Sequence, residues 1–193
     1  LFEYWFDEDH EVADFPVPFR YYFCQREAIE TLVWLVEIAG QRDAQKLIQS
    51  HATKFKRDLF TDNIVFQTTM DGKRQLRRYV PELDGEGLQD LPPEDLRRFA
   101  FKMATGSGTT WVIAMAVVWA HFHKKRVPES ELSTNFLIVA PNVIVYQRLE
   151  RDFACNNIFR QLPLVPPEWR PFEPKVILRG EATEPDASGN LFL

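Results

Sequence analysis

The chain has 193 residues, of which 45% are hydrophobic and 26% are charged, and its net charge at pH 7 is −5. This composition is typical of a globular protein with one core, or with one core and an appendage, and the charge gives no global signature of a nucleic-acid binder. Two cysteines are too few for a disulfide framework, and no apolar run reaches the roughly 20 residues that span a bilayer. The acidic N-terminus does not resemble a secretory signal. These features predict a cytoplasmic protein with two buried, reduced thiols and no membrane partner.

Residues 1–40 are predicted to form an N-terminal segment with one main helix. The helix is expected over 25–39, with Gly40 as its C-cap. Its core face is an apolar stripe at helical spacing, made of Ile29, Leu32, Val33 and Val36.

Residues 41–97 are predicted to be an insertion or linker that carries a small hairpin. The paired strands are expected at 64–68 and 75–80, around a turn at 70–73. The acidic, Pro- and Gly-rich stretch 81–95 is expected to be a loop. The basic residues of the hairpin region could contact DNA or could form a solvated surface, and the sequence leaves both readings open.

Residues 98–193 show alternating strand and helix patterns. Such an alternation predicts an α/β domain with a parallel sheet. In chain order the expected elements are a strand at 98–103, a helix at 110–123, a strand at 136–140, a helix at 143–153 and a strand at 175–178.

The stretch MATGSGTT at 103–110 joins the first of these strands to the first of these helices. Glycines at 106 and 108 allow the backbone to bend so that successive amides face an anion, and the following helix adds its N-terminal dipole. The strict phosphate-loop pattern fails at two positions, because Met103 replaces the first glycine and Thr109 replaces the lysine. The alternative is a Gly-rich turn that needs no ligand.

Three segments in order resemble one protein family. MATGSG-x-T resembles motif I of superfamily 2 helicases and translocases, and is most similar to the ATPase subunit of type III restriction enzymes. FRYYFCQREAI at 19–29 resembles the Q-motif of that family, and FLIVAPNVIVYQRLERDF at 136–153 resembles its motif Ia region. The resemblance covers roughly 19–39 and 98–153, with a weaker echo at 189–193.

The resemblance implies a partial RecA-like P-loop domain, an α/β fold in which helices flank a parallel sheet, at 98–193. It implies ATP and Mg²⁺ as ligands and double-stranded DNA as a partner, with Thr110 as the Mg²⁺ ligand. The implied nucleotide-binding residues are Arg20, Gln25, Thr105, Gly106, Ser107, Gly108, Thr109 and Thr110. The implied nucleic-acid contacts are Pro141, Asn142 and Val143, with Arg148 and Arg151 as further candidates.

Thr109 departs from the family pattern at the lysine that neutralises charge during phosphoryl transfer. We therefore expect no catalytic residue in this chain and little or no ATP hydrolysis, and the sequence does not tell whether Thr109 is natural or engineered. The acidic motif II and the second RecA-like domain are not found before Leu193. The chain is accordingly expected to be part of a larger protein, with the rest of a helicase and a methyltransferase or other restriction subunit as partners.

The leading prediction is an ATP-binding part of a DNA-dependent ATPase of a restriction-modification or related DNA-processing system. One alternative is a pseudo-ATPase scaffold that binds nucleotide or DNA without hydrolysis. Another is an interaction domain whose Gly-rich turn binds nothing.

Overall fold

The computed structural model describes residues 1–13, 17–39, 64–68, 70–72, 74–79, 88–90, 99–181 and 190–193. The chain divides into two compact units. Unit 1 comprises Leu1–Thr31 and Phe101–Leu193, and unit 2 comprises Leu32–Ala100. The sequence also favours a short helix over 44–51, and these positions lie outside the described residues.

Two helices form the N-terminal part of the chain. Helix α1 is short, Phe2–Phe6, and helix α2 covers Phe23–Val33 and continues as one π-helical stretch, η1, over Trp34–Ile38. The helix predicted over 25–39 is thus confirmed, and it begins two residues earlier. Of the predicted stripe, Ile29 and Val33 are buried.

Unit 2 contains a three-stranded antiparallel sheet in the order β1-β2-β3. Strand β1 (Ile64–Thr68) pairs with β2 (Arg74–Tyr79) in the register Ile64 to Arg78, and Gly72 takes a φ of 73° in the turn between them. The predicted hairpin is therefore confirmed. The predicted loop at 81–95 is wrong at 88–90, where β3 (Leu88–Asp90) pairs with β2, and the rest of that stretch lies outside the described residues.

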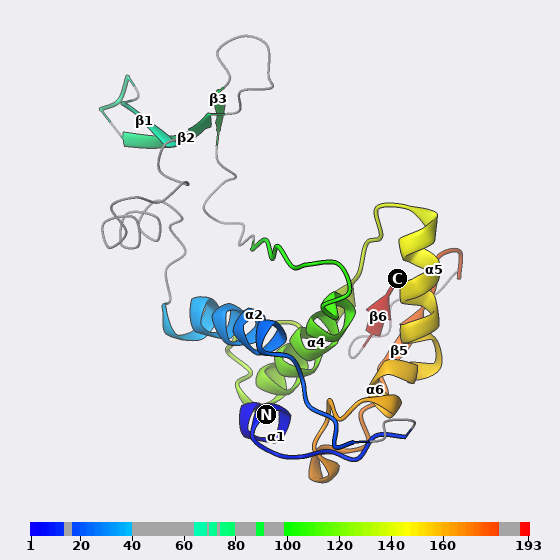
Figure 1. The fold of residues 1–193 in the computed structure, drawn as a ribbon. Coiled ribbons are helices and arrows are strands. Elements are labelled where there is room, and N and C mark those ends of the chain that lie inside the picture. The colour runs from blue at the N-terminus through cyan, green and yellow to red at the C-terminus, as the bar shows by residue number, and fades with distance from the viewer. Residues whose placement is uncertain are drawn as a thin grey trace. The chain divides into compact units, whose positions relative to one another are not determined.

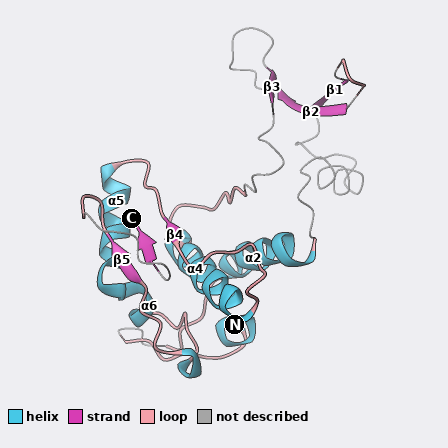
Figure 2. Cartoon of the chain, turned by 180° about the vertical axis from the view of Figure 1, so that it is seen from behind, coloured by secondary structure: helices cyan, strands magenta, loops and turns pink. Residues whose placement is uncertain are grey.

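Unit 1 holds the parallel sheet and the longest helix, α4 (Figure 1). Helix α5 lies beside β5 and β6 in both views (Figures 1 and 2). In chain order the elements from α4 onward are α4 (Thr109–Arg126), β4 (Phe136–Leu137), α5 (Val143–Phe153), η2 (Ala154–Asn156), α6 (Asn157–Gln161), η3 (Pro167–Trp169), β5 (Lys175–Ile177) and β6 (Asn190–Phe192).

The parallel sheet has the strand order β4-β6-β5. Leu191 of β6 lies opposite Phe136 on one side and Val176 on the other. The Asn135 side chain accepts a hydrogen bond from the Asn190 amide at 3.1 Å and so extends the contact between β4 and β6. A parallel sheet with helices beside it is the predicted α/β class.

The strand predicted at 98–103 is not formed. Residues 99–103 have no regular secondary structure, and Phe101 is 40% exposed. A strand requires a hydrogen-bonded neighbour, and among the residues that the structure describes none pairs with this segment. The strand predicted at 136–140 is shortened to β4 for a related reason, because its partner β6 is only three residues long.

The core of unit 1 is built around α4, whose middle part is apolar nearly all round and buried between Val112 and His121, as expected of an interior helix. Trp5 is 1% exposed, and its indole donates a hydrogen bond to the Leu164 carbonyl at 2.8 Å, which fixes α1 to the same core. Both cysteines, Cys24 and Cys155, are free and exposed, so the prediction of buried thiols is wrong. No helix in the described ranges is both long enough and apolar enough to cross a bilayer.

Candidate nucleotide site

A tight turn over 104–108 leads directly into α4. Gly106 and Gly108 both lie in the left-handed region, with φ of 83° and 80°. The Ser107 amide and hydroxyl both donate to the Ala104 carbonyl, at 3.2 and 2.7 Å, and close the turn. Because glycine reaches this conformation without steric cost, the two glycines account for the shape of the turn.

The turn presents backbone amides that have no acceptor in the described part of the chain. The Trp111 and Val112 amides donate to the Gly108 carbonyl, at 2.9 and 3.3 Å, as the first turn of α4 begins. The amides ahead of them are left over, as at any helix N-terminus, and they belong to Gly106, Gly108, Thr109 and Thr110. Such amides together with the helix dipole favour an anion, above all a phosphate.

Gln25 of α2 holds the turn from the other side. Its side chain is fully buried, and its Nε2 donates to the Ser107 carbonyl at 2.9 Å. Its Oε1 accepts from the Tyr22 amide at 2.8 Å. A Cβ atom on Gly108 would lie 2.1 Å from Gln25 Nε2. Gln25 is thus no solvated helix residue, and Gly108 is required both by its φ and by the approach of this amide.

An aromatic cluster ties the segment before α2 to the start of α4. The ring centroids of Phe19 and Tyr21 lie 5.4 and 6.1 Å from that of Trp111. Phe19 and Tyr21 are buried, whereas Arg20 and Tyr22, between and after them, are exposed. Burial raises the pKa of Tyr21. The alternation places one face of this segment against α4 and the other in solvent.

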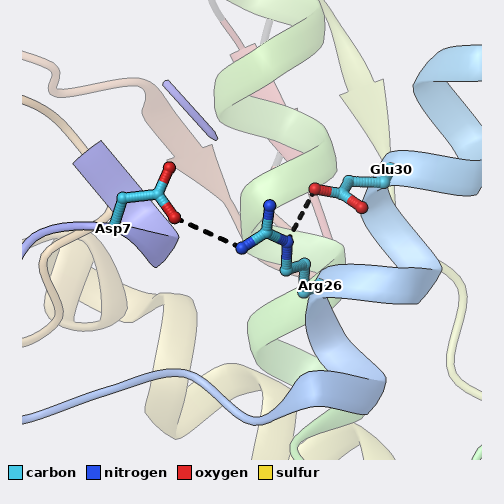
Figure 3. A network of polar contacts seen from close by, with 3 residues as sticks. All are labelled: Asp7, Arg26 and Glu30. Atoms are coloured by element: carbon cyan, nitrogen blue, oxygen red, sulfur yellow. Dashed lines mark hydrogen bonds and ion pairs between the residues drawn. The ribbon is translucent and has the colours of Figure 1, made fainter. Parts of the chain in front are cut away.

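Arg26 holds the N-terminal helix against α2 (Figure 3). Its Nε donates to Glu30 at 2.8 Å, its Nη1 donates to Asp7 at 3.3 Å, and its guanidinium lies 5.3 Å from the centre of the Phe6 ring. The hydrogen bond to Glu30 raises the pKa of Arg26. Exposed pairs of this kind contribute little individually, but together they fix where α1 meets the helix that carries Gln25.

The start of α5 forms a second exposed turn. Asn142 is the N-cap, and its Oδ1 accepts a hydrogen bond from the Val145 amide at 3.0 Å. Pro141, Asn142 and Val143 are all exposed. Arg148 and Arg151 are exposed on the same helix. Because only the side-chain oxygen of Asn142 serves the cap, its amide group can still donate to an external acceptor.

We compared the sequence with models of known protein families. Residues 19–162 match the family described as type III restriction enzyme, res subunit, which is 144 of the 193 residues. The chain belongs to this family. Searches of curated proteins and of solved structures gave no match. Membership in the res-subunit family supports a helicase-like ATPase domain of a restriction system.

The res-subunit family generally uses ATP and Mg²⁺, and the turn fits the phosphates of a nucleotide better than it fits a metal alone. Thr110 is half-buried and Thr109 is exposed at the first position of α4. Within the described ranges there is no group of three or more His, Cys, Asp or Glu side chains that could hold a metal ion. Since Mg²⁺ is often held by few protein oxygens together with phosphates and water, the Thr110 hydroxyl fits such a shared site.

A cavity of about 1100 Å³ lies elsewhere in unit 1. It is lined by the N-terminal segment and by residues 152–170, and Trp111 is its contribution from α4. Burial raises the pKa of Asp152 in its wall. None of the turn residues 104–110 lines it, whereas Asp9, which is bonded to Arg20, does.

Sequence reasoning missed the residues that support the site rather than form it. Arg26 and Trp111 act through neighbours distant in sequence, and no local motif marks them. The capping role of Asn142 had a visible signal, because Asn is a preferred N-cap residue and stands directly before the predicted helix.

Proposed function

We propose that the chain is the ATP-binding part of a DNA-dependent ATPase of the helicase or translocase kind, in a restriction-modification or related DNA-processing system. The observation that carries this proposal is the turn 104–108. Its two left-handed glycines precede α4, and its Ser107 carbonyl accepts a hydrogen bond from the buried Gln25. Family membership supports the coarser part, a helicase-like ATPase domain. A RecA-like fold, compatible with the parallel sheet, is part of the proposal.

In this proposal the amides of Gly106, Gly108, Thr109 and Thr110 hold the nucleotide phosphates. The fixed amides need no reorganisation when an anion arrives, which favours binding. Arg20 would flank the base. The Gln25 side chain is fully buried and is bonded to Ser107 and Tyr22, so its proposed role is to hold the turn in shape rather than to contact the adenine edge. Mg²⁺ bound with the nucleotide, with Thr110 as a ligand, would neutralise part of the phosphate charge.

Thr109 makes hydrolysis weak in the proposed site. A threonine side chain is too short and uncharged to neutralise the charge that develops on the transferred phosphoryl group. Loss of one such electrostatic contact costs on the order of 10²–10³ in rate. With threonine at position 109, the chain is therefore proposed to bind ATP weakly and to hydrolyse it slowly.

Double-stranded DNA is the proposed partner at the start of α5. Contacts to backbone phosphates position a strand without reading its sequence, and the exposed Pro141, Asn142 and Val143 suit that use. Arg148 and Arg151 would add charge. A further part of the helicase and a methyltransferase or other restriction subunit remain proposed partners.

The exposed Thr109 also favours a second candidate, a pseudo-ATPase scaffold that binds nucleotide or DNA and does not hydrolyse ATP. The two candidates differ in what a lysine at position 109 would restore. The codon at this position in the source gene discriminates between them at little effort, because a native lysine codon removes the main support for the scaffold.

The testing experiment is ATP hydrolysis, with and without duplex DNA, by the protein that contains this chain and by its Thr109→Lys and Thr109→Met variants. Methionine matches lysine in reach and carries no charge. We expect Thr109→Lys to raise the DNA-stimulated rate by about 10²–10³-fold, and Thr109→Met to leave it unchanged.

An equal gain with methionine would contradict the electrostatic reason. Activity with none of the three residues, while ATP still binds, would favour the scaffold. If ATP binds to none of them, the proposed nucleotide site is wrong.

A further inference from the structure

The N-terminal acidic segment is bound in an extended pairing to the segment that precedes α2. The Phe19 amide donates to the His10 carbonyl at 2.7 Å, in an isolated antiparallel bridge. His10 is buried, and its Nε2 lies 2.6 Å from the Tyr4 carbonyl. Two anchors therefore fix the backbone of His10, and with it the position of the neighbouring Asp9.

This pairing brings Asp9 to Arg20. The Arg20 Nε donates to Asp9 Oδ1 at 2.6 Å. The hydrogen bond lowers the pKa of Asp9 and raises that of Arg20. The Arg20 side chain is nevertheless 73% exposed, so the carboxylate holds one edge of the guanidinium while most of the group stays open to solvent.

Arg20 stands on a segment that is fixed relative to the phosphate-binding turn. Its neighbours Phe19 and Tyr21 pack against Trp111, the third residue of α4. The Tyr22 amide donates to Gln25, whose other end holds Ser107. Both flanks of Arg20 are thus tied to the turn or to the helix that follows it.

We propose that Asp9 is a positioning residue, which fixes the plane of the Arg20 guanidinium so that its open face stacks on the base of the bound nucleotide. The proposal rests on the proposed function and deepens it. A guanidinium is planar, weakly hydrated and stacks on aromatic rings, but a free arginine side chain loses rotamer entropy when it does so. Holding it before the ligand arrives removes part of that cost.

Asp9 lies before Phe19, where the family match begins. The residue that positions Arg20 therefore comes from the N-terminal segment of this chain, outside the part that matches the family. Because an exposed ion pair contributes little to folding, the effect of Asp9 belongs in the affinity for a ligand that has a base, and not in the stability of the protein.

The experiment compares two probes with Mg²⁺, ATP and inorganic tripolyphosphate, by titration calorimetry on the 193-residue chain, with Thr109 and in a Thr109→Lys background. Tripolyphosphate reports on the turn alone, and ATP reports on the turn and the base contact. The variants are Asp9→Asn, Asp9→Glu and, as a matched control, Glu173→Gln. The control opens the Arg160–Glu173 pair, which at 2.9 Å and 60% exposure of each side chain resembles the Asp9 pair.

We expect Asp9→Asn to weaken ATP binding about 3- to 10-fold, to leave tripolyphosphate binding unchanged, and to leave the unfolding temperature within error. Asp9→Glu should restore most of the ATP affinity, and Glu173→Gln should change neither probe. Equal losses for both probes, or no loss for either, would overturn the inference and leave the phosphate site standing. If the parent chains bind neither probe, the proposed function itself is overturned, and the inference falls with it.

Discussion

At the scale of single residues, the contact between Gln25 and the turn sets the strictest demand on the sequence. The turn needs glycine at both 106 and 108 for backbone reasons, since φ is 83° and 80°. Only at Gly108 does a neighbour also occupy the space of a side chain, with Gln25 Nε2 at 2.1 Å from an ideal Cβ, whereas nothing lies within 4 Å at Gly106. The two glycines therefore form a matched pair for separating conformational strain from steric exclusion.

We predict that Gly108→Ala destabilises the protein more than Gly106→Ala does. Gly106→Ala should cost about 1–2 kcal/mol, the penalty of a left-handed alanine, and Gly108→Ala should cost that amount and the displacement of Gln25 in addition. Urea unfolding monitored by circular dichroism measures both changes.

Gln25→Ala combined with Gly108→Ala tests the cause of the difference. Removing the amide opens the space, so the double variant should lose less than the sum of the two single changes. Additive losses would show that the Gln25 contact does not explain the demand for glycine.

The sequence predicts the site only where the residues that form it are consecutive or belong to a local motif. The turn, its two glycines and Thr109 stand together in one stretch, and Gln25 follows from a motif. That Gln25 is buried and bonded to Ser107 depends on contacts across 82 positions, which no local pattern records. The pairing of Asp9 with Arg20 is hidden for the same reason, because it follows from a single backbone bridge.

At the scale of elements, helices were more predictable than strands. The helix over 143–153 is found at the predicted bounds as α5. Helix α4 runs to Arg126, three residues beyond its predicted end, because the basic residues of its last turn favour a helix C-terminus. Strand lengths depend on partners elsewhere in the chain, so β4 ends after two residues and no strand forms at 99–103.

The cap of α5 gives a prediction that separates folding from DNA binding. Asn142→Ala should lower the free energy of unfolding by about 1 kcal/mol, because the Val145 amide loses its acceptor. Asn142→Asp should keep the cap, since aspartate is an equally good N-cap residue, while its charge repels phosphate. We therefore expect only Asn142→Asp to keep full stability and yet to weaken duplex DNA binding.

Thermal unfolding and fluorescence anisotropy with a labelled duplex, at two salt concentrations, check this pair of variants. DNA affinity that is the same for Asn142→Asp as for the unchanged chain would exclude this turn from the nucleic-acid interface. A loss that persists at high salt would argue against phosphate repulsion as its cause.

At the scale of the whole molecule, unit 1 depends on a core around α4 that includes the titratable side chain of His121. His121 is 6% exposed, and its ring lies 4.9 Å from that of Phe172 and 5.3 Å from that of Phe122. Its Nδ1 is buried, with no hydrogen-bond partner among the described residues. Burial, with a smaller contribution from the charge of Lys125, lowers the pKa of His121 to about 4.

A core that excludes a proton from His121 must lose stability in acid. Between pH 6.5, the ordinary pKa of histidine, and about 4, the unfolded chain binds a proton that the folded chain does not. The free energy of unfolding should therefore fall through this range, by at most about 3 kcal/mol at 1.36 kcal/mol per pKa unit, and His121 should cause no further loss below it.

We predict that His121→Leu removes this component, so that the stability difference between His121→Leu and the unchanged chain shifts in favour of leucine as pH falls from 7 to 4. The comparison cancels the carboxylates, which titrate alike in both proteins. Urea unfolding at half-unit pH steps measures it, and a difference that stays constant with pH would mean that His121 titrates in the folded core as it does in water.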